Sequence, residues 1–110
     1  MAHIPNTSCI EACNACASAC DHCAAACLGE DNVAHMARCI ALDLDCADLC
    51  RLVASSMARD GEFARQICRL CADVCEACGK ECRQHEHPHC QACAEACEAC
   101  ATECRNMAEG

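Results

Sequence analysis

The sequence predicts an all-α protein, an antiparallel up-down-up-down four-helix bundle with a cysteine-lined core. Cysteines recur in four blocks at steps of three, four or seven residues, which aligns side chains along one seam of a bundled helix. The residues between them are mostly Ala, Glu, Asp, Arg and Leu, and all of these except Asp favour helix. The breaks between blocks are short, and short connections make consecutive helices antiparallel neighbours.

A single domain is expected over residues 1–110. Gly29 can end the first helix, and Asp31 or Asn32 can cap the second. The expected helices lie near residues 8–28, 32–59, 62–84 and 88–107.

The other breaks carry matching signals. Ser8 and Glu11 have the spacing of a capping box at the start of the first helix. Gly61 lies in the break between the second and third helices, and Pro88 suits the first turn of the fourth.

A second apolar stripe, offset from the cysteines, runs along the second and third helices. A helix with two apolar faces must bury both, so we expect an oligomer interface there. The alternative is that these side chains thicken the core of one bundle. The residues are Val33, Ala37, Ile40, Leu42, Leu44, Ala47, Leu49 and Val53 in the second helix and Phe63, Ile67, Leu70 and Val74 in the third.

Composition bounds the function. The net charge of −9 argues against nucleic-acid partners and anionic membrane surfaces, which attract basic patches. The chain shows neither a secretory signal nor an 18-residue apolar stretch, so a cytoplasmic location is expected. Thiols are kept reduced there, and nineteen cysteines in 110 residues therefore indicate metal binding before disulfides.

The nineteen cysteines are the candidate metal ligands, and their a/d positions would line the bundle with sulfur. They are Cys9, Cys13, Cys16, Cys20, Cys23 and Cys27, then Cys39, Cys46 and Cys50, then Cys68, Cys71, Cys75, Cys78 and Cys82, and finally Cys90, Cys93, Cys97, Cys100 and Cys104.

Several uses of these thiols compete. Neighbours three or four apart on one helix do not meet disulfide geometry well. The Cys-x₂-Cys-x₂-Cys run of an iron–sulfur site is absent from the sequence. Structural zinc usually uses isolated four-ligand sites. Zinc or cadmium sequestration and a thiol/disulfide redox buffer remain as alternatives, and so does a helical interaction module in which cysteines are only small core residues.

Cu(I), with multiple ions per chain, fits the pattern best because it is soft and prefers thiolates. Two thiols at i and i+4 can bracket a near-linear ion, and thiolates can bridge two ions. Before loading, a buried neutral thiol packs like a small hydrophobic side chain, so the empty bundle can fold.

The predicted topology gathers polar metal ligands at one end of the bundle, near Cys27, Cys82 and Cys90. The opposite end, with Met57, Phe63 and Met107, is expected to be plugged. Asp43 falls at a seam position, where it would line the tube as a minor oxygen donor or sit near its wall. The candidates for admitting copper are His35, Met36, His85, His87 and His89.

Over residues 8–107, the alternation of Cys-x-x-x-Cys and Cys-x-x-Cys on four helices resembles the bacterial Cys-rich four-helix-bundle copper storage proteins. In lacking a recognisable signal peptide, the sequence resembles the cytosolic branch of that family. The resemblance implies a tetramer of bundles, many Cu(I) ions stored in each, and no enzymatic activity. It also implies that Cys-x-x-x-Cys pairs hold copper: Cys9/Cys13, Cys16/Cys20, Cys23/Cys27, Cys46/Cys50, Cys71/Cys75, Cys78/Cys82, Cys93/Cys97 and Cys100/Cys104. Cys39, Cys68 and Cys90 would bridge between helices.

Overall fold

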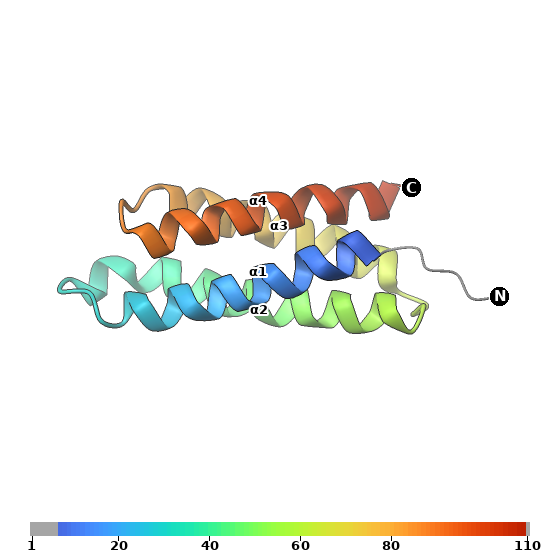
Figure 1. Ribbon diagram of the computed structural model, residues 1–110, viewed down its shortest axis with the longest axis horizontal. Coiled ribbons are helices and arrows are strands. Elements are labelled where there is room, and N and C mark those ends of the chain that lie inside the picture. Colours follow the sequence, from blue (N-terminus) through green and yellow to red (C-terminus); the bar gives the residue numbers. More distant parts are fainter. Residues whose placement is uncertain (1–6, 110) are drawn as a thin grey trace.

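Residues 7–109 are described by the computed structural model, and they form four long helices that run side by side (Figure 1). Helix α1 packs against α2 and α4, and α3 packs against the same two helices, so the four enclose one core. The prediction of an antiparallel all-α bundle is confirmed. The elements are α1 (Thr7–Cys27), the short 3₁₀ helix η1 (Val33–Met36), α2 (Ala37–Ala58), α3 (Ala64–Arg83) and α4 (Pro88–Glu109).

The cysteine seam of each helix faces the core. All nineteen cysteine residues are at most 1% exposed, and small side chains such as Ala17, Ala72 and Ala94 fill the space beside them. Small side chains let the helices approach closely. At Gly79 of α3, an added Cβ would lie 3.4 Å from the Cβ of Cys97 on α4. The core is therefore built from cysteine and alanine, where an ordinary bundle uses leucine.

The start of the second helix differs from the expectation. Residues 33–36 form a 3₁₀ helix, and α2 begins at Ala37. Asn32 lies at the N-cap of the 3₁₀ helix, but its side chain makes no capping hydrogen bond. The tighter turn places Met36 inside, 1% exposed, and leaves His35 outside.

The capping box expected in the first helix is also wrong. Ser8 lies inside α1, and its Oγ donates a hydrogen bond to Glu103 Oε1 on α4 at 3.2 Å. This contact joins two helices, whereas a capping box would have closed one helix end.

The break after α2 is a Schellman motif. The Gly61 N–H donates to the Ser56 carbonyl at 2.8 Å, and the Asp60 N–H donates to the Met57 carbonyl at 3.2 Å. Asp60 takes the left-handed conformation, with φ 57°. A Cβ at Gly61 would meet Ser56 Oγ and lie 3.3 Å from the Ser56 carbonyl oxygen, so a larger residue here would need the Ser56 side chain to move.

The second apolar stripe divides into two parts. Ile40, Leu42, Leu49, Ile67 and Val74 pack partly buried against the core, and Ala47 and Val53 are fully buried, as the thickened-core alternative required. The remaining large side chains of α2 and α3 and the residue before α3 lie in solvent. They are Leu44 (49% exposed), Leu52 (43%), Phe63 (58%) and Leu70 (52%), of which Leu52 was not in the predicted stripe. The stripe members Val33 and Ala37 are also exposed.

Candidate metal site

The inward thiols line the core along the bundle, and many of their sulfurs are in contact. Neighbouring Sγ atoms from different helices lie 3.5 Å apart for Cys46 and Cys75, 3.7 Å for Cys16 and Cys97, and 3.8 Å for Cys16 and Cys46. These contacts link α1, α2, α3 and α4 through one layer of side chains. All nineteen cysteines are free thiols, and their separations are well above the 2.05 Å of a disulfide bond.

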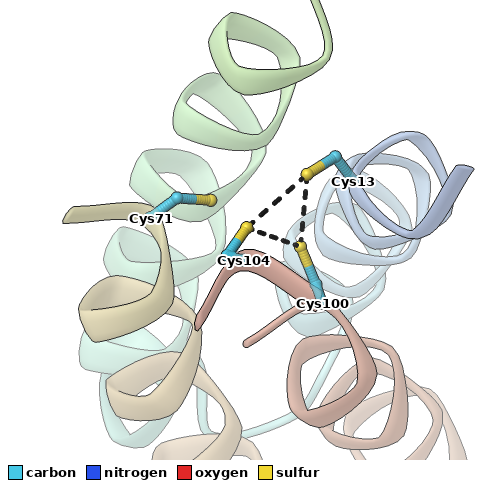
Figure 2. A group of neighbouring side chains, drawn as sticks. All are labelled: Cys13, Cys71, Cys100 and Cys104. Atoms are coloured by element: carbon cyan, nitrogen blue, oxygen red, sulfur yellow. Dashed lines mark hydrogen bonds between the residues drawn. The ribbon is translucent and has the colours of Figure 1, made fainter. Parts of the chain in front are cut away.

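Thiols from three or more helices converge on common points. Figure 2 shows Cys13 of α1 and Cys100 and Cys104 of α4 with their sulfurs in a triangle, and Cys71 of α3 pointing toward them. The sides of the triangle measure 3.5, 3.8 and 3.9 Å. The four sulfurs lie within 4.8 Å of one another, close enough to share ions. Similar quartets are Cys16/Cys20/Cys46/Cys97 and Cys23/Cys27/Cys39/Cys90.

Pairs within one helix are also in contact. Five of the eight Cys-x-x-x-Cys pairs have their Sγ atoms 3.8–4.0 Å apart: Cys16/Cys20, Cys23/Cys27, Cys46/Cys50, Cys71/Cys75 and Cys100/Cys104. A modest rotation of each side chain can therefore place two thiolates on either side of one ion.

His89 faces the thiols at one end of the bundle. Its Nδ1 lies 3.6 Å from the sulfurs of Cys23 and Cys90 and 3.9 Å from that of Cys27. Its Nε2 is 2.8 Å from the carboxylate of Glu30. The hydrogen bond from His89 lowers the pKa of Glu30. Burial raises the pKa of the Cys27 thiol to about 11 and also raises that of Cys90, so both are neutral at pH 7.

The other candidate ligands of this end surround His89. His85 is 6% exposed, donates from Nε2 to Glu81 Oε2 at 2.8 Å and packs edge-to-face on His35, with 5.2 Å between ring centroids. The ring of His87 stacks on that of His89 at 5.3 Å. An open hollow of about 230 Å³ leads in from the surface, lined by Glu30, Asp31, Asn32, His35, Met36 and His87. The structure thus brings all five predicted His and Met candidates to one end, where the α1–α2 and α3–α4 connections meet (Figure 1).

The opposite end is closed differently from the expectation. Met57 is 7% exposed, and the Cys68 thiol contacts its sulfur at 3.9 Å. Met107 is partly buried against the core, and Ala108 is 3% exposed. Phe63 does not take part in the plug, because it precedes α3 in the turn and its side chain is 58% exposed.

Asp43 occupies a seam position of α2 and is fully buried among thiols. Its Oδ1 accepts from the thiols of Cys78 at 3.1 Å, Cys93 at 3.4 Å and Cys82 at 3.6 Å. Burial raises the pKa of this carboxyl to about 8. The sequence left open whether Asp43 lines the tube or sits near its wall. The structure shows that it lines the tube.

Two carboxylates at the histidine end, those of Glu30 and Glu81, were not predicted from the sequence. Glu81 lies four residues before His85, a helical spacing that could have indicated the pair. Glu30 lies 59 residues from His89, and no sequence pattern connects them.

A bundle that buries nineteen free thiols in its core, with imidazoles at one end, defines a cysteine-rich metal-storage protein. A thiol/disulfide redox buffer would instead need exposed, reactive thiols. No helix among residues 7–109 combines the length and apolar character needed to span a bilayer.

Comparison with known proteins agrees with this class. The family model described as "Copper storage protein" matches residues 2–109. An uncharacterized cysteine-rich protein, YhjQ of Bacillus subtilis (strain 168), is 54% identical over 82 residues, which cover 74% of this chain and 76% of that protein. The Cu(I)-bound copper storage protein BsCsp3 is similar in structure, with a TM-score of 0.90 and 53% identity over 94% of this chain and 97% of that chain.

A cytosolic copper storage protein from Streptomyces lividans, described with five coppers, has a TM-score of 0.90 and 44% identity over 94% of this chain and 91% of that chain. The chain belongs to the copper storage protein family. The predictions of copper storage and of multiple Cu(I) ions as the cargo are confirmed.

Proposed function

We propose that the nineteen buried cysteines are the copper ligands of this chain and fill with a column of Cu(I) ions, on the order of one ion per thiol. The observation that carries this proposal is the set of Sγ–Sγ contacts of 3.5–4.0 Å that joins cysteines of all four helices, extended by quartets whose sulfurs lie within 4.8 Å of one another. A small shift of a side chain in such a quartet can place its sulfur between two ions.

The charges of such a column balance. A thiol that binds Cu(I) loses its proton, so each stored Cu⁺ is matched by one thiolate and the loaded core stays near neutral. Burying unpaired charge would otherwise be costly. The same exchange lets the empty bundle fold around neutral thiols and accept copper later.

Copper enters, in this proposal, at the histidine end. His35, Met36 and His87 line an open hollow at this end, and His89 stacks on His87 and faces the thiols. His85 packs on His35 at the same end. Imidazole and thioether bind Cu(I) more weakly than thiolate, so they can take up an ion and pass it inward to Cys23, Cys27 and Cys90.

The protein acts, in the same proposal, as a cytosolic homotetramer of single-domain bundles and not as an enzyme. The location follows the description of the Streptomyces lividans relative as cytosolic. A purely storage role is supported by the burial of all nineteen thiols, none of which is set apart as a nucleophile. The tetramer is supported by the four large apolar side chains that α2, α3 and the turn before α3 leave in solvent.

The copper column is tested by anaerobic titration of the fully reduced protein with Cu(I) against a competing chelator. We expect tight uptake of more than about ten ions per chain, while the thiols become unreactive toward a thiol reagent. Saturation at one or two ions, or preference for zinc, would contradict the column.

The interface is tested by Leu44→Glu with Leu70→Glu, followed by light scattering coupled to size exclusion. We expect the assembly to dissociate toward monomers, because two charges per chain would be buried without partners. Leu28→Glu is the matched control, since Leu28 is 61% exposed just after α1 and outside the α2–α3 face. A double variant that keeps the wild-type mass would place the interface elsewhere.

A further inference from the structure

Glu30 stands behind the histidine that faces the thiols. It lies in the connection after α1, outside every helix, and its carboxylate reaches across to the first turn of α4. One oxygen, Oε2, is 2.8 Å from His89 Nε2 and 3.5 Å from His87 Nδ1. The side chain of Glu30 is 29% exposed and that of His89 is 13% exposed, so this contact is partly shielded from water.

The contact determines which nitrogen of His89 carries the hydrogen. An ionised carboxylate can only accept a hydrogen bond, so the Nε2 atom of the ring must be the donor. A neutral imidazole with its hydrogen on Nε2 has a bare lone pair on Nδ1. That lone pair faces the sulfurs of Cys23, Cys27 and Cys90 at 3.6–3.9 Å.

We propose that Glu30 is a positioning residue, which holds His89 as the Nε2–H tautomer with Nδ1 turned toward the Cys23–Cys27–Cys90 thiols. This inference rests on the proposed role of the histidine end in admitting copper. An arriving Cu(I) then meets a nitrogen that can bind at once, without loss of a ring proton. Carboxylate–histidine–metal arrangements of this kind orient the ring and strengthen the ligand.

Glu30 also fixes the ring in space. The contact joins the connection between α1 and α2 to the start of α4, which lie at the same end of the bundle (Figure 1). His87 stacks on His89 with an interplanar angle of 3° and lies beside the same carboxylate oxygen. The second pair, Glu81 with His85, also binds Nε2, but that ring packs on His35. The Glu30 pair is thus the one whose histidine meets three thiols.

The tautomer is measured directly in reduced, copper-free protein labelled with ¹⁵N-histidine, by long-range ¹H–¹⁵N correlation. We expect wild-type His89 to show the Nε2–H pattern and Glu30→Ala to lose it. Glu30→Gln should restore it, because the amide oxygen can still accept from Nε2–H. An unchanged His89 pattern in Glu30→Ala overturns the inference, whatever the uptake rates are.

The consequence for copper is measured by stopped-flow transfer of the first equivalents from a Cu(I) chelate. We expect Glu30→Ala to load about tenfold more slowly, the usual effect of removing such a partner, and Glu30→Gln to load near the wild-type rate. Glu86→Ala is the matched control, since it removes one exposed carboxylate from the same end.

A comparison with His89→Ala separates two kinds of failure. If His89→Ala loads slowly and Glu30→Ala loads normally, the inference is overturned and the histidine end still admits copper. If His89→Ala loads at the wild-type rate, the proposed role of this end fails, and the tautomer measurement alone decides whether Glu30 positions the ring.

Discussion

Replacing Cys23, Cys27 and Cys90 with alanine is expected to slow copper uptake by about tenfold or more, because removing direct ligands should cost at least as much as removing an outer partner. These three thiols surround His89 Nδ1, and they would be the first that an ion reaches if copper enters, as proposed, at the histidine end. Without them, the nearest sulfur acceptors lie deeper in the bundle. The rate is measured by stopped-flow transfer from a Cu(I) chelate to reduced protein under anaerobic conditions.

The matched control removes three thiols from the other end, Cys9, Cys68 and Cys104. These residues are also at most 1% exposed, so both triple variants lose similar packing. Both should store about three fewer ions if each thiol holds on the order of one. Only the variant at the histidine end should load slowly. Equal slowing in the two variants would mean that copper enters from both ends or through the wall.

The cysteine spacing alone predicted the fold and the core. When thiols repeat every three or four residues on four segments, the helices pack with all cysteine seams facing inward. Every cysteine is buried in this way. The helix ends were less predictable because they depend on local competition. Residues 33–36 have helical spacing, yet they form a 3₁₀ turn whose last residue, Met36, is buried. The predicted topology placed Phe63 in the plug at the far end, but in the turn before α3 its side chain is exposed.

The histidine end shows what sequence periodicity cannot supply. Periodicity fixes which residues share a face within a helix, and it placed the histidines at one end through the topology. It carries no information on which residues of two separate connections come into contact. The contact between Glu30 and His89 could therefore not be predicted from the sequence. Asp43 was intermediate. Its register predicted a seam position, but only the packed thiols of Cys78, Cys82 and Cys93 show that it is enclosed.

The enclosed carboxyl of Asp43 is expected to make the copper-free protein less stable as the pH rises. Its pKa is raised from 3.8 to about 8 in the folded state, chiefly by burial. Between these values the folded protein holds a proton that the unfolded chain has released. Stability is therefore greatest below about pH 4 with respect to this group and is lost as the pH rises through about 8. The difference corresponds to several kcal/mol of unfolding free energy, since one pKa unit is about 1.4 kcal/mol.

Asp43→Asn isolates this contribution, because the amide has nearly the same shape and does not titrate. Thermal unfolding of reduced, metal-free protein should show wild type and variant closest together at pH 4 and the variant clearly more stable at pH 8. Asp45→Asn, which changes an exposed carboxylate on the same helix, should follow wild type at both values. A constant gap between wild type and Asp43→Asn would mean that the surrounding thiols keep the carboxylate ionised throughout. In that case the three thiol hydrogen bonds to Oδ1 outweigh the desolvation of the charge, and the core tolerates an anion before any copper arrives.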